Sequence, residues 1–397
     1  MISEQEALAA ILAAVPAPVT ELLPLSAAAG RTAAQDIHAT LALPSFDNSS
    51  MDGWALHAAD CGKAGVPLTI TGEQPAGADR GLTIQAGESV RIFTGAPLPA
   101  GTAAVVMQED AARDGNTVIV REAAQPGEFI RRAGSDVCAG QLLVRQGAPL
   151  TPQRIGVLAA QGFASVGCGK LPRAAIVCTG EELIAPGLPL PYTGSLYNSN
   201  GPMLAALMET SRTALSVAVD TVRDDLQALT ECLRQRLEES DVLLIAGGVS
   251  VGDHDLVKPA LQQLGIVPNF WRVSVKPGKP FLFCTRGRQV IFGLPGNPVS
   301  AFVTAILFVL PALRRMAGAA EAAPCLTTAC ALTDLHNKGD RTHYVRGHHD
   351  AAAGTFQPTG TQESHAIAGL SHANALAKLE PGAFVAASGA VSLLLLP

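Results

Sequence analysis

Between residues 171 and 318, apolar segments of strand length alternate four times with a loop and a segment of helix length. The apolar segments begin at Arg173, Leu215, Asp241 and Gln289. Strands that alternate with helices are typical of a mostly parallel sheet with helices on both faces. We therefore predict a doubly wound α/β domain in this part of the chain.

Two helix starts in this domain are predicted from single residues. Asn200 or Gly201 is expected to cap a helix that has Pro202 in its first turn, because proline is favoured there. Asp224 is expected to begin the second helix, since aspartate is a good N-cap residue. The predicted helices cover residues 202–210, 224 onward, 255–264 and 298–316.

The segments on either side of this domain have a different pattern. Residues 3–15 are predicted to form an amphipathic helix, because Ser3 and Glu6 have the spacing of a capping box. From about residue 41 to 170, short apolar segments separated by Gly and Pro indicate β structure, with one helix near residues 152–161. Short strands return after about residue 321 and predict a small all-β terminal domain. The whole chain is therefore expected to be multidomain, with α/β and all-β parts.

Composition excludes several classes of protein. The chain is 48% hydrophobic and carries 28 basic against 34 acidic residues, so its formal charge of −6 argues against a general nucleic-acid binder. Its eight cysteines include no C-x-x-C pair, which favours reduced thiols over disulfides or a zinc site. The N-terminus is acidic, unlike a signal peptide, and prolines interrupt the apolar residues 293–313. We expect a cytoplasmic protein that does not insert into a membrane.

Polar loops follow the strands of the predicted sheet. Loops at the carboxyl ends of parallel strands meet in one crevice, where hydroxyls, carboxylates and backbone N–H groups can bind a ligand. Lysines at 276 and 279 stand in a turn made rigid by Pro and Gly. Cations beside carboxylates indicate a phosphate or pyrophosphate with a divalent metal. Each loop also has a purely structural explanation: Gly-Gly as a turn, the lysines as solvated charges, Asp224 as an N-cap and Asn297 as a helix entry.

The N-terminal β region contains a second polar segment. Residues 44–55 hold two aspartates, an asparagine and several hydroxyls, and residues 93–97 and 131–137 add a hydroxyl, two arginines and a carboxylate. This composition is not that of a strand. An elaborate turn held by Asx and Ser side chains is the structural alternative.

These segments, in this order, resemble the motifs of the molybdopterin molybdenumtransferase family, which includes bacterial MoeA and the E domain of gephyrin. The similarity extends over essentially the whole chain. The motifs lie at residues 44–55, 93–97, 131–137, 179–183, 197–202, 247–255, 276–280 and 293–300, with a weaker one at 360–365.

The resemblance implies an elongated homodimer with four domains per subunit. The implied domains are a linking domain with the N-terminal helix (residues 1–40 and 139–170), a β-rich domain (41–138), an α/β domain similar to MoaB and Mog (171–320) and a C-terminal β-barrel (321–397). In this family the cleft joins the α/β domain of one subunit to the β domain of the other.

The implied reaction is the last step of molybdenum cofactor biosynthesis. Molybdate is inserted into adenylylated molybdopterin (molybdopterin-AMP), and AMP is released. Mg²⁺ is the implied cofactor, with Zn²⁺ as the alternative, and the adenylyltransferase that supplies the substrate is an implied partner. The resemblance assigns catalysis to Asp52, Thr94, Asp136, Glu182, Asp225 and Asp255. Metal ligands would be Glu182, Asp225 and Asp255. Substrate binding would fall to Ser250, Lys276, Lys279, Pro295, Asn297, Pro298, Arg346 and Ser364. Asp52 would act in trans.

Two other functions stay open at this point. Residues 171–318 alone would fit a molybdopterin adenylyltransferase, although that function leaves residues 44–55 and 131–137 without a purpose. A molybdopterin-binding scaffold that has lost turnover is the second alternative, and the retained acidic positions argue against it. Asn198 stands where the family often has Asp, which removes one carboxylate from the expected nucleotide contacts.

Overall fold

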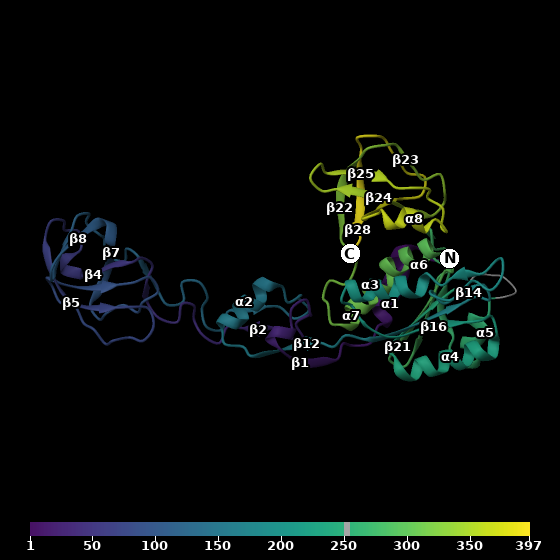
Figure 1. The fold of residues 1–397 in the computed structure, drawn as a ribbon, viewed down its shortest axis with the longest axis horizontal. Helices are drawn as coiled ribbons and strands as arrows, with labels where there is room; N and C mark the ends of the chain where they lie inside the picture. Colours follow the sequence, from purple (N-terminus) through teal and green to yellow (C-terminus); the bar gives the residue numbers. More distant parts are fainter. Residues whose placement is uncertain (250–254) are drawn as a thin grey trace. The chain divides into compact units, whose positions relative to one another are not determined.

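The computed structural model of the chain describes residues 1–249 and 255–397 (Figure 1). The chain forms two compact units. The first unit contains Met1–Gln35, Gln146–Ile155 and Ala164–Pro397, and the second contains Asp36–Arg145 and Gly156–Phe163.

A six-stranded sheet is the centre of the first unit. Its strand order is β16-β13-β17-β21-β20-β18, and the first four strands are parallel. Two further strands extend one edge: β20 pairs with β21, and β18 pairs with β20, both in antiparallel orientation. The strands are β13 (Arg173–Thr179), β16 (Leu215–Val222), β17 (Val242–Ala246), β18 (Pro268–Trp271), β20 (Leu282–Arg286) and β21 (Gln289–Leu294). The prediction of a mostly parallel α/β sheet is confirmed.

Helices cover both faces of this sheet because its central strands are apolar on both sides. Ala174, Ile176 and Cys178 of β13 join one core, and the alternate residues Ala175 and Val177 join the other. In Figure 1, α4 and α5 lie on one side of the sheet and α3, α1 and α6 on the other. The helices are α1 (Glu4–Ala14), α3 (Asn200–Thr210), α4 (Leu226–Glu239), α5 (Val257–Gln263), α6 (Pro298–Thr304) and α7 (Leu310–Met316).

The helix starts correct two predictions. Helix α3 begins at Asn200 and has Ser199 as its N-cap, so Pro202 lies in the first turn, where its missing N–H costs no hydrogen bond. Helix α4 is capped by Asp225, whose carboxylate accepts the Ala228 N–H at 2.7 Å, and not by Asp224. The capping box at the start of α1 is formed as predicted.

The segment from Pro298 to Met316 is one continuous apolar helix with a π-helical part, η4 (Ala305–Val309), between α6 and α7. It is the one helix in the described residues that is long and apolar enough to cross a membrane. However, 83% of its most apolar 18-residue stretch is buried inside the protein. It is therefore a core helix of the first unit.

The C-terminal strands form a small closed barrel. They follow the order β24-β25-β22-β28-β26, and β26 pairs with β24 to close the ring. Strand β19 joins this sheet from the α/β part by pairing in parallel with β24. The elements are β19 (Val275–Lys276), β22 (Leu326–Ala331), β24 (Thr342–Asp350), β25 (Thr355–Pro358), α8 (Ile367–Ser371), β26 (Ala375–Leu379) and β28 (Ala390–Leu395), with a short pair, β23 (Leu335–His336) and β27 (Phe384–Val385).

The second unit is built on a β-sheet, as its short apolar segments predicted. Its strand order is β7-β4-β6-β5-β9-β8. The strands are β4 (Gly53–His57), β5 (Pro67–Gln74), β6 (Glu88–Ile92), β7 (Thr102–Met107), β8 (Ala111–Asp114) and β9 (Thr117–Val120).

Short strand pairs and one helix complete the N-terminal half of the chain. Strand β1 pairs with β12 in the first unit, whereas β2 pairs with β11 and β3 with β10 in the second. The helix expected near residues 152–161 is α2 (Pro152–Ala160). The strands are β1 (Thr20–Pro24), β2 (Ile37–His38), β3 (Asn48–Ser49), β10 (Ile130–Arg131), β11 (Leu142–Val144) and β12 (Ser165–Gly169).

Candidate active site

A cavity of about 1020 Å³ lies at the carboxyl ends of β13, β17 and β21 in the first unit. This is the edge at which parallel α/β sheets bind ligands. The barrel contributes part of the wall, so the cavity lies between the α/β part and the barrel. Its lining comprises Thr179, Gly180, Glu182, Leu183, residues 196–200, Asp224, residues 246–248, Asp255, residues 276–280, residues 295–298, Ser300, Arg341 and residues 362–365.

Carboxylates from three loops line the cavity. Asp224 follows β16, and its two oxygens accept the Thr179 hydroxyl at 2.9 Å and the Glu181 N–H at 3.2 Å. These bonds hold Asp224 at the end of the neighbouring strand β13. Glu182 and Asp255 line the same cavity from the loops after β13 and β17. The structure thus places the predicted Glu182 and Asp255 at the cavity together with Asp224, whereas the predicted Asp225 caps α4.

A glycine after β17 allows two strand ends to approach closely. Gly247 has a φ of +99°, and a Cβ atom there would lie 2.3 Å from the carbonyl oxygen of Thr179. Its N–H donates to the Leu294 carbonyl at 3.1 Å. Gly247 thus joins the ends of β13, β17 and β21 at the edge of the cavity. Ser250, which was predicted to bind substrate from this loop, lies outside the described residues.

Cationic side chains also line the cavity. Lys276 and Lys279 belong to residues 276–280, which we call the lysine turn, and both are exposed. Arg341 also lines the cavity, and its guanidinium donates to the carbonyl oxygen of Val275 beside the turn at 3.1 Å. These cations suit an oxyanion or a phosphate. The sequence predicted the two lysines but not Arg341.

A buried histidine lies behind the lysine turn. His343 pairs with Lys276 across the β19–β24 ladder and is 7% exposed. Burial, and then the surrounding positive charges, lower the pKa of His343 to about 4. Those charges belong to Lys276, Arg341 and Arg346. His343 is therefore neutral at physiological pH and adds no charge to the cationic side.

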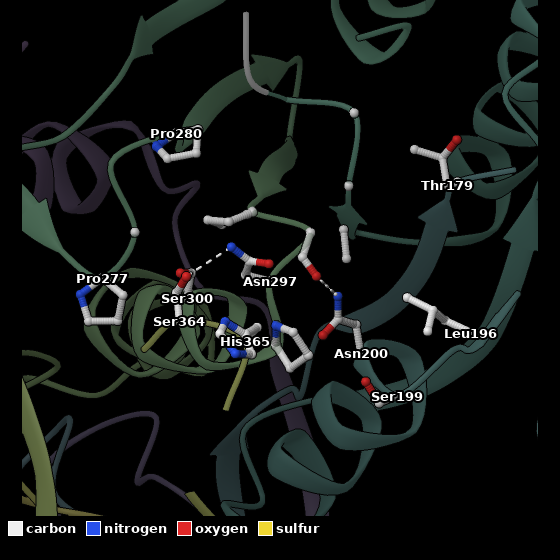
Figure 2. A pocket seen from close by; sticks show the side chains of 18 of the residues that line it. Thr179, Leu196, Ser199, Asn200, Pro277, Pro280, Asn297, Ser300, Ser364 and His365 are labelled. Atoms are coloured by element: carbon white, nitrogen blue, oxygen red, sulfur yellow. Dashed lines mark hydrogen bonds between the residues drawn. The ribbon is translucent and has the colours of Figure 1, made fainter. Parts of the chain in front are cut away.

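Residues 295–298, which we call the proline loop, are held from two directions. Asn200, at the start of α3, donates to the Gly296 carbonyl at 2.7 Å. On the other side, the Asn297 amide donates to the Ser364 hydroxyl of the barrel at 2.9 Å (Figure 2). The Val299 N–H donates to the Ser364 carbonyl at 3.2 Å. Asn297 precedes α6 as predicted, but its side chain bonds to the barrel instead of capping the helix.

Arg346 does not line the cavity. It is 1% exposed and lies behind residues 359–365, which we call the Ser364 loop. Its guanidinium donates to the carbonyl oxygens of Thr361 and Glu363. Burial lowers the pKa of Arg346, while the carboxylate of Glu363 acts in the opposite direction. The structure therefore places this predicted substrate-binding residue one layer behind the wall, because its side chain satisfies loop carbonyls.

The three remaining predicted residues lie in the second unit. Thr94 donates to one Asp52 oxygen through both its N–H and its hydroxyl, each at 2.8 Å. These bonds, the backbone one first, lower the pKa of Asp52 below its usual value. Asp136 is exposed, and its N–H donates to the Leu43 carbonyl at 3.0 Å. The structure thus brings Asp52 and Thr94 into contact.

The three predicted metal ligands do not all line the cavity. Asp225 is occupied as the cap of α4, while Glu182 and Asp255 line the cavity. Within residues 1–249 and 255–397, no three His, Cys, Asp or Glu side chains are grouped closely enough to hold a metal ion. The described residues alone therefore do not provide a complete protein site for Mg²⁺ or Zn²⁺.

Besides Arg341, residues at the cavity that the sequence did not assign to the site include Asp224, Asn200 and Gln362. The sequence pointed to the position of Asp224, since it is adjacent to Asp225, a predicted metal ligand. Asn200 lies in the motif at residues 197–202, but its only individual role was expected to be that of a helix cap. Gln362 lies in the weaker motif at residues 360–365, but its contacts with the backbone of a strand distant in sequence had no signal.

Comparisons with known proteins identify the family of the chain. Three family models match the chain: the MoeA N-terminal region (domain I and II) over residues 2–162, a probable molybdopterin binding domain over 175–315, and the MoeA C-terminal region (domain IV) over 328–396. A molybdopterin molybdenumtransferase of Nostoc sp. is 35% identical over 381 residues, covering 93% of this chain and 87% of the relative. That of Haemophilus influenzae is 34% identical, covering 96% and 95%.

A solved structure extends the similarity to the fold. The molybdopterin biosynthesis MoeA protein of Pyrococcus horikoshii superimposes with a TM-score of 0.86 at 28% identity, over 100% of both chains. Sequence and fold therefore agree over the full length. The chain belongs to the molybdopterin molybdenumtransferase (MoeA) family.

Proposed function

We propose that this protein is a molybdopterin molybdenumtransferase, the transferase that inserts molybdate into adenylylated molybdopterin and releases AMP in the last step of molybdenum cofactor biosynthesis. The observation that carries the proposal is the cavity at the sheet edge, where carboxylates and a lysine turn line one space. The relatives in Nostoc and Haemophilus bear this enzyme's name.

The lining of the cavity suits the two anionic groups of this reaction. Molybdate is an oxyanion, and the pyrophosphate link of molybdopterin-AMP is also negatively charged. Lys276, Lys279 and Arg341 supply positive charge, and the Ser364 hydroxyl and Asn297 amide supply polar groups that need no change in charge. We assign molybdate to the part of the cavity that these cations and polar groups line. An oxygen nucleophile, water or an oxygen of molybdate, attacks a phosphorus of the pyrophosphate link; as the new P–O bond forms, the bridging P–O bond breaks and AMP separates from the pterin phosphate. Lys276, Lys279 and Arg341 stabilise the charge that develops on the phosphoryl oxygens.

We propose Mg²⁺ as the divalent cation, bound by one or two of the cavity carboxylates Glu182, Asp255 and Asp224. Asp224 replaces Asp225, whose carboxylate caps α4. Mg²⁺ is commonly bound by one or two carboxylates together with substrate phosphates and water. Zn²⁺ needs at least three protein ligands, and the described part of the chain brings no such group together. The ion would neutralise charge on the pyrophosphate.

The oligomer and the location of the protein are also proposals. We propose a cytoplasmic homodimer whose subunits keep the four domains expected from the sequence. In that dimer, Asp52, Thr94 and Asp136 of the second unit would serve the cavity of the other subunit. The adenylyltransferase that makes molybdopterin-AMP would deliver the substrate.

The test supplies purified protein with molybdopterin-AMP, Mg²⁺ and molybdate and measures AMP by chromatography. We expect AMP release that depends on molybdate. Glu182→Gln and Asp255→Asn should abolish it, whereas Glu238→Gln, an exposed carboxylate on α4 outside the cavity, should not. AMP release that is insensitive to molybdate, or unchanged in both cavity variants, would refute the proposal.

The same material separates the two alternatives. An adenylyltransferase would transfer AMP from ATP to molybdopterin, but the matches to the MoeA N- and C-terminal regions do not favour that function. A scaffold would bind molybdopterin-AMP without consuming it. Incubation with ATP and molybdopterin, followed by the same chromatography, distinguishes the three.

A further inference from the structure

The side chain of Gln362 is hydrogen-bonded to the backbone of Arg346 just past the end of β25. Strand β25 pairs with β24 as far as Pro358 and Gly347, and the Thr359 N–H makes one further backbone bond, to the Arg346 carbonyl. The Arg346 N–H donates to Gln362 Oε1 at 2.9 Å, and Gln362 Nε2 donates to the Arg346 carbonyl at 3.1 Å. Two residues in an antiparallel ladder exchange the same pair of bonds. The Gln362 amide therefore extends the ladder past the end of β25.

Other bonds fix the rest of the Ser364 loop to the same point. Gln362 Nε2 also donates to the Thr359 carbonyl at 3.1 Å, and the Thr359 N–H donates to the Arg346 carbonyl at 3.0 Å. The buried guanidinium of Arg346 donates to the carbonyls of Thr361 and Glu363. The loop has no helix or strand between residues 359 and 366, so these side chains satisfy its backbone.

The fixed loop presents Ser364 to the cavity. Ser364 lies two residues after Gln362, and its hydroxyl and carbonyl are bonded to Asn297 and Val299 at the start of α6. Both Ser364 and Asn297 line the cavity (Figure 2). A shift of the Ser364 loop would therefore move a cavity hydroxyl and release the proline loop on its barrel side.

We propose that Gln362 is a positioning residue for the oxyanion substrate. It holds the Ser364 loop on β24 and so places the Ser364 hydroxyl and the Asn297 amide at the side of the cavity that binds molybdate. This inference rests on the proposed function. It deepens that proposal by giving the barrel a role in binding the anion.

The test replaces Gln362 with Met, which has a similar length and cannot exchange the two ladder bonds. Gln357→Met, at an exposed position on β25, is the matched control. We expect the KM for molybdate of Gln362→Met to rise about tenfold, the change that the loss of a few hydrogen bonds can cause. The kcat at saturating molybdate should change much less, and Gln357→Met should match the wild type. Calorimetric titration with molybdate alone should show the same loss of affinity.

A double-mutant cycle tests whether Gln362 acts through Ser364. If it does, Gln362→Met combined with Ser364→Ala should bind molybdate no more weakly than Ser364→Ala alone. Additive losses would overturn the inference, and so would a lowered melting temperature without a change in molybdate KM or affinity. If Gln362→Met does not fold, Gln362→Glu replaces it in the same cycle, because the carboxylate still accepts the Arg346 N–H but cannot donate.

The wild-type protein separates this inference from the proposed function. Molybdate-dependent AMP release by the wild type together with an unaffected Gln362→Met variant would refute the inference alone. No molybdate-dependent release by the wild type would refute the proposed function.

Discussion

Gly278, in the middle of the lysine turn, is a position where one methyl group should disturb both folding and anion binding. Its φ is +125°, which residues with a side chain rarely adopt. A Cβ atom there would lie 2.5 Å from Cγ2 of Thr304, a buried residue of α6, whereas ordinary contacts begin at 3.4 Å. Thr304 or the lysine turn would have to move by about the 0.9 Å difference between these distances. We predict that Gly278→Ala moves Lys276 and Lys279 away from their places in the cavity.

The magnitude has two separable parts. A non-glycine residue in a rare backbone region costs about 1–3 kcal/mol, and overpacking a buried site costs about 1–3 kcal/mol more. Gly278→Ala should therefore lower the free energy of unfolding by about 2–6 kcal/mol. Gly265→Ala is the control for the backbone part, because Gly265 has a φ of +71° but no atom within 4 Å of the position that a Cβ would take. It should cost about 1–2 kcal/mol.

A double variant isolates the contact. Thr304→Ser removes Cγ2 but keeps the hydroxyl that donates to the Ser300 carbonyl at 2.8 Å. The combination of Gly278→Ala and Thr304→Ser should recover the packing part, about 1–3 kcal/mol. Urea unfolding can be followed by tryptophan fluorescence in a Trp54→Phe background, which leaves Trp271 of β18 as the only tryptophan. If Gly278→Ala costs no more than Gly265→Ala, or if Thr304→Ser recovers nothing, the steric argument is wrong.

Three further predictions concern individual side chains. Asp225→Ala should lose the cap of α4 and about 1 kcal/mol of stability but retain AMP release. Asp224→Asn should lose AMP release. The reverse result in thermal melting and AMP assays would contradict the assignment of one aspartate to the cap and the other to the cavity. The folded-state pKa of His343 is lowered from 6.5 to about 4, so the unfolded state binds more protons between pH 6.5 and 4. The free energy of unfolding should therefore fall as the pH drops through that range, by at most about 3 kcal/mol. Urea titrations from pH 7 to 4 should show a smaller loss in His343→Phe than in the wild type, and equal losses would contradict this. In the native protein a thiol reagent should modify the exposed Cys138 and Cys325 first, and mass spectrometry that found other cysteines reacting as fast would contradict the burial described here.

The α/β architecture could be predicted because its pattern is local. Each parallel strand is apolar on both faces and is followed by a helix, so the order of elements determines which loops share the carboxyl edge. That reasoning, from the sequence alone, placed Glu182, Asp255 and the two lysines at one edge of the sheet. It also predicted the helix after Pro298 and its burial.

Details that depend on one residue of register, or on distant contacts, could not be predicted. A shift of one residue in the start of α4 decides that Asp225 caps the helix and Asp224 faces the cavity. The hydrogen bond from Asn297 to Ser364 joins residues 67 positions apart, and the sequence contains no periodic pattern that pairs them. Arg346 is buried behind the Ser364 loop for a similar reason, since the carbonyls that it satisfies belong to a segment without regular structure.

The pairing of β19 with β24 has a consequence for protein engineering. Covalently, Val275 and Lys276 belong to the α/β part, but their backbone is hydrogen-bonded into the barrel sheet. A truncation before residue 321 would leave this lysine-bearing edge unpaired, even though the α/β sheet itself stayed whole. Chimeras between family members should therefore exchange residues 273–281 together with the C-terminal segment. The reason is that the backbone pairing of the lysine turn crosses the boundary at which the chain passes from the α/β part to the barrel.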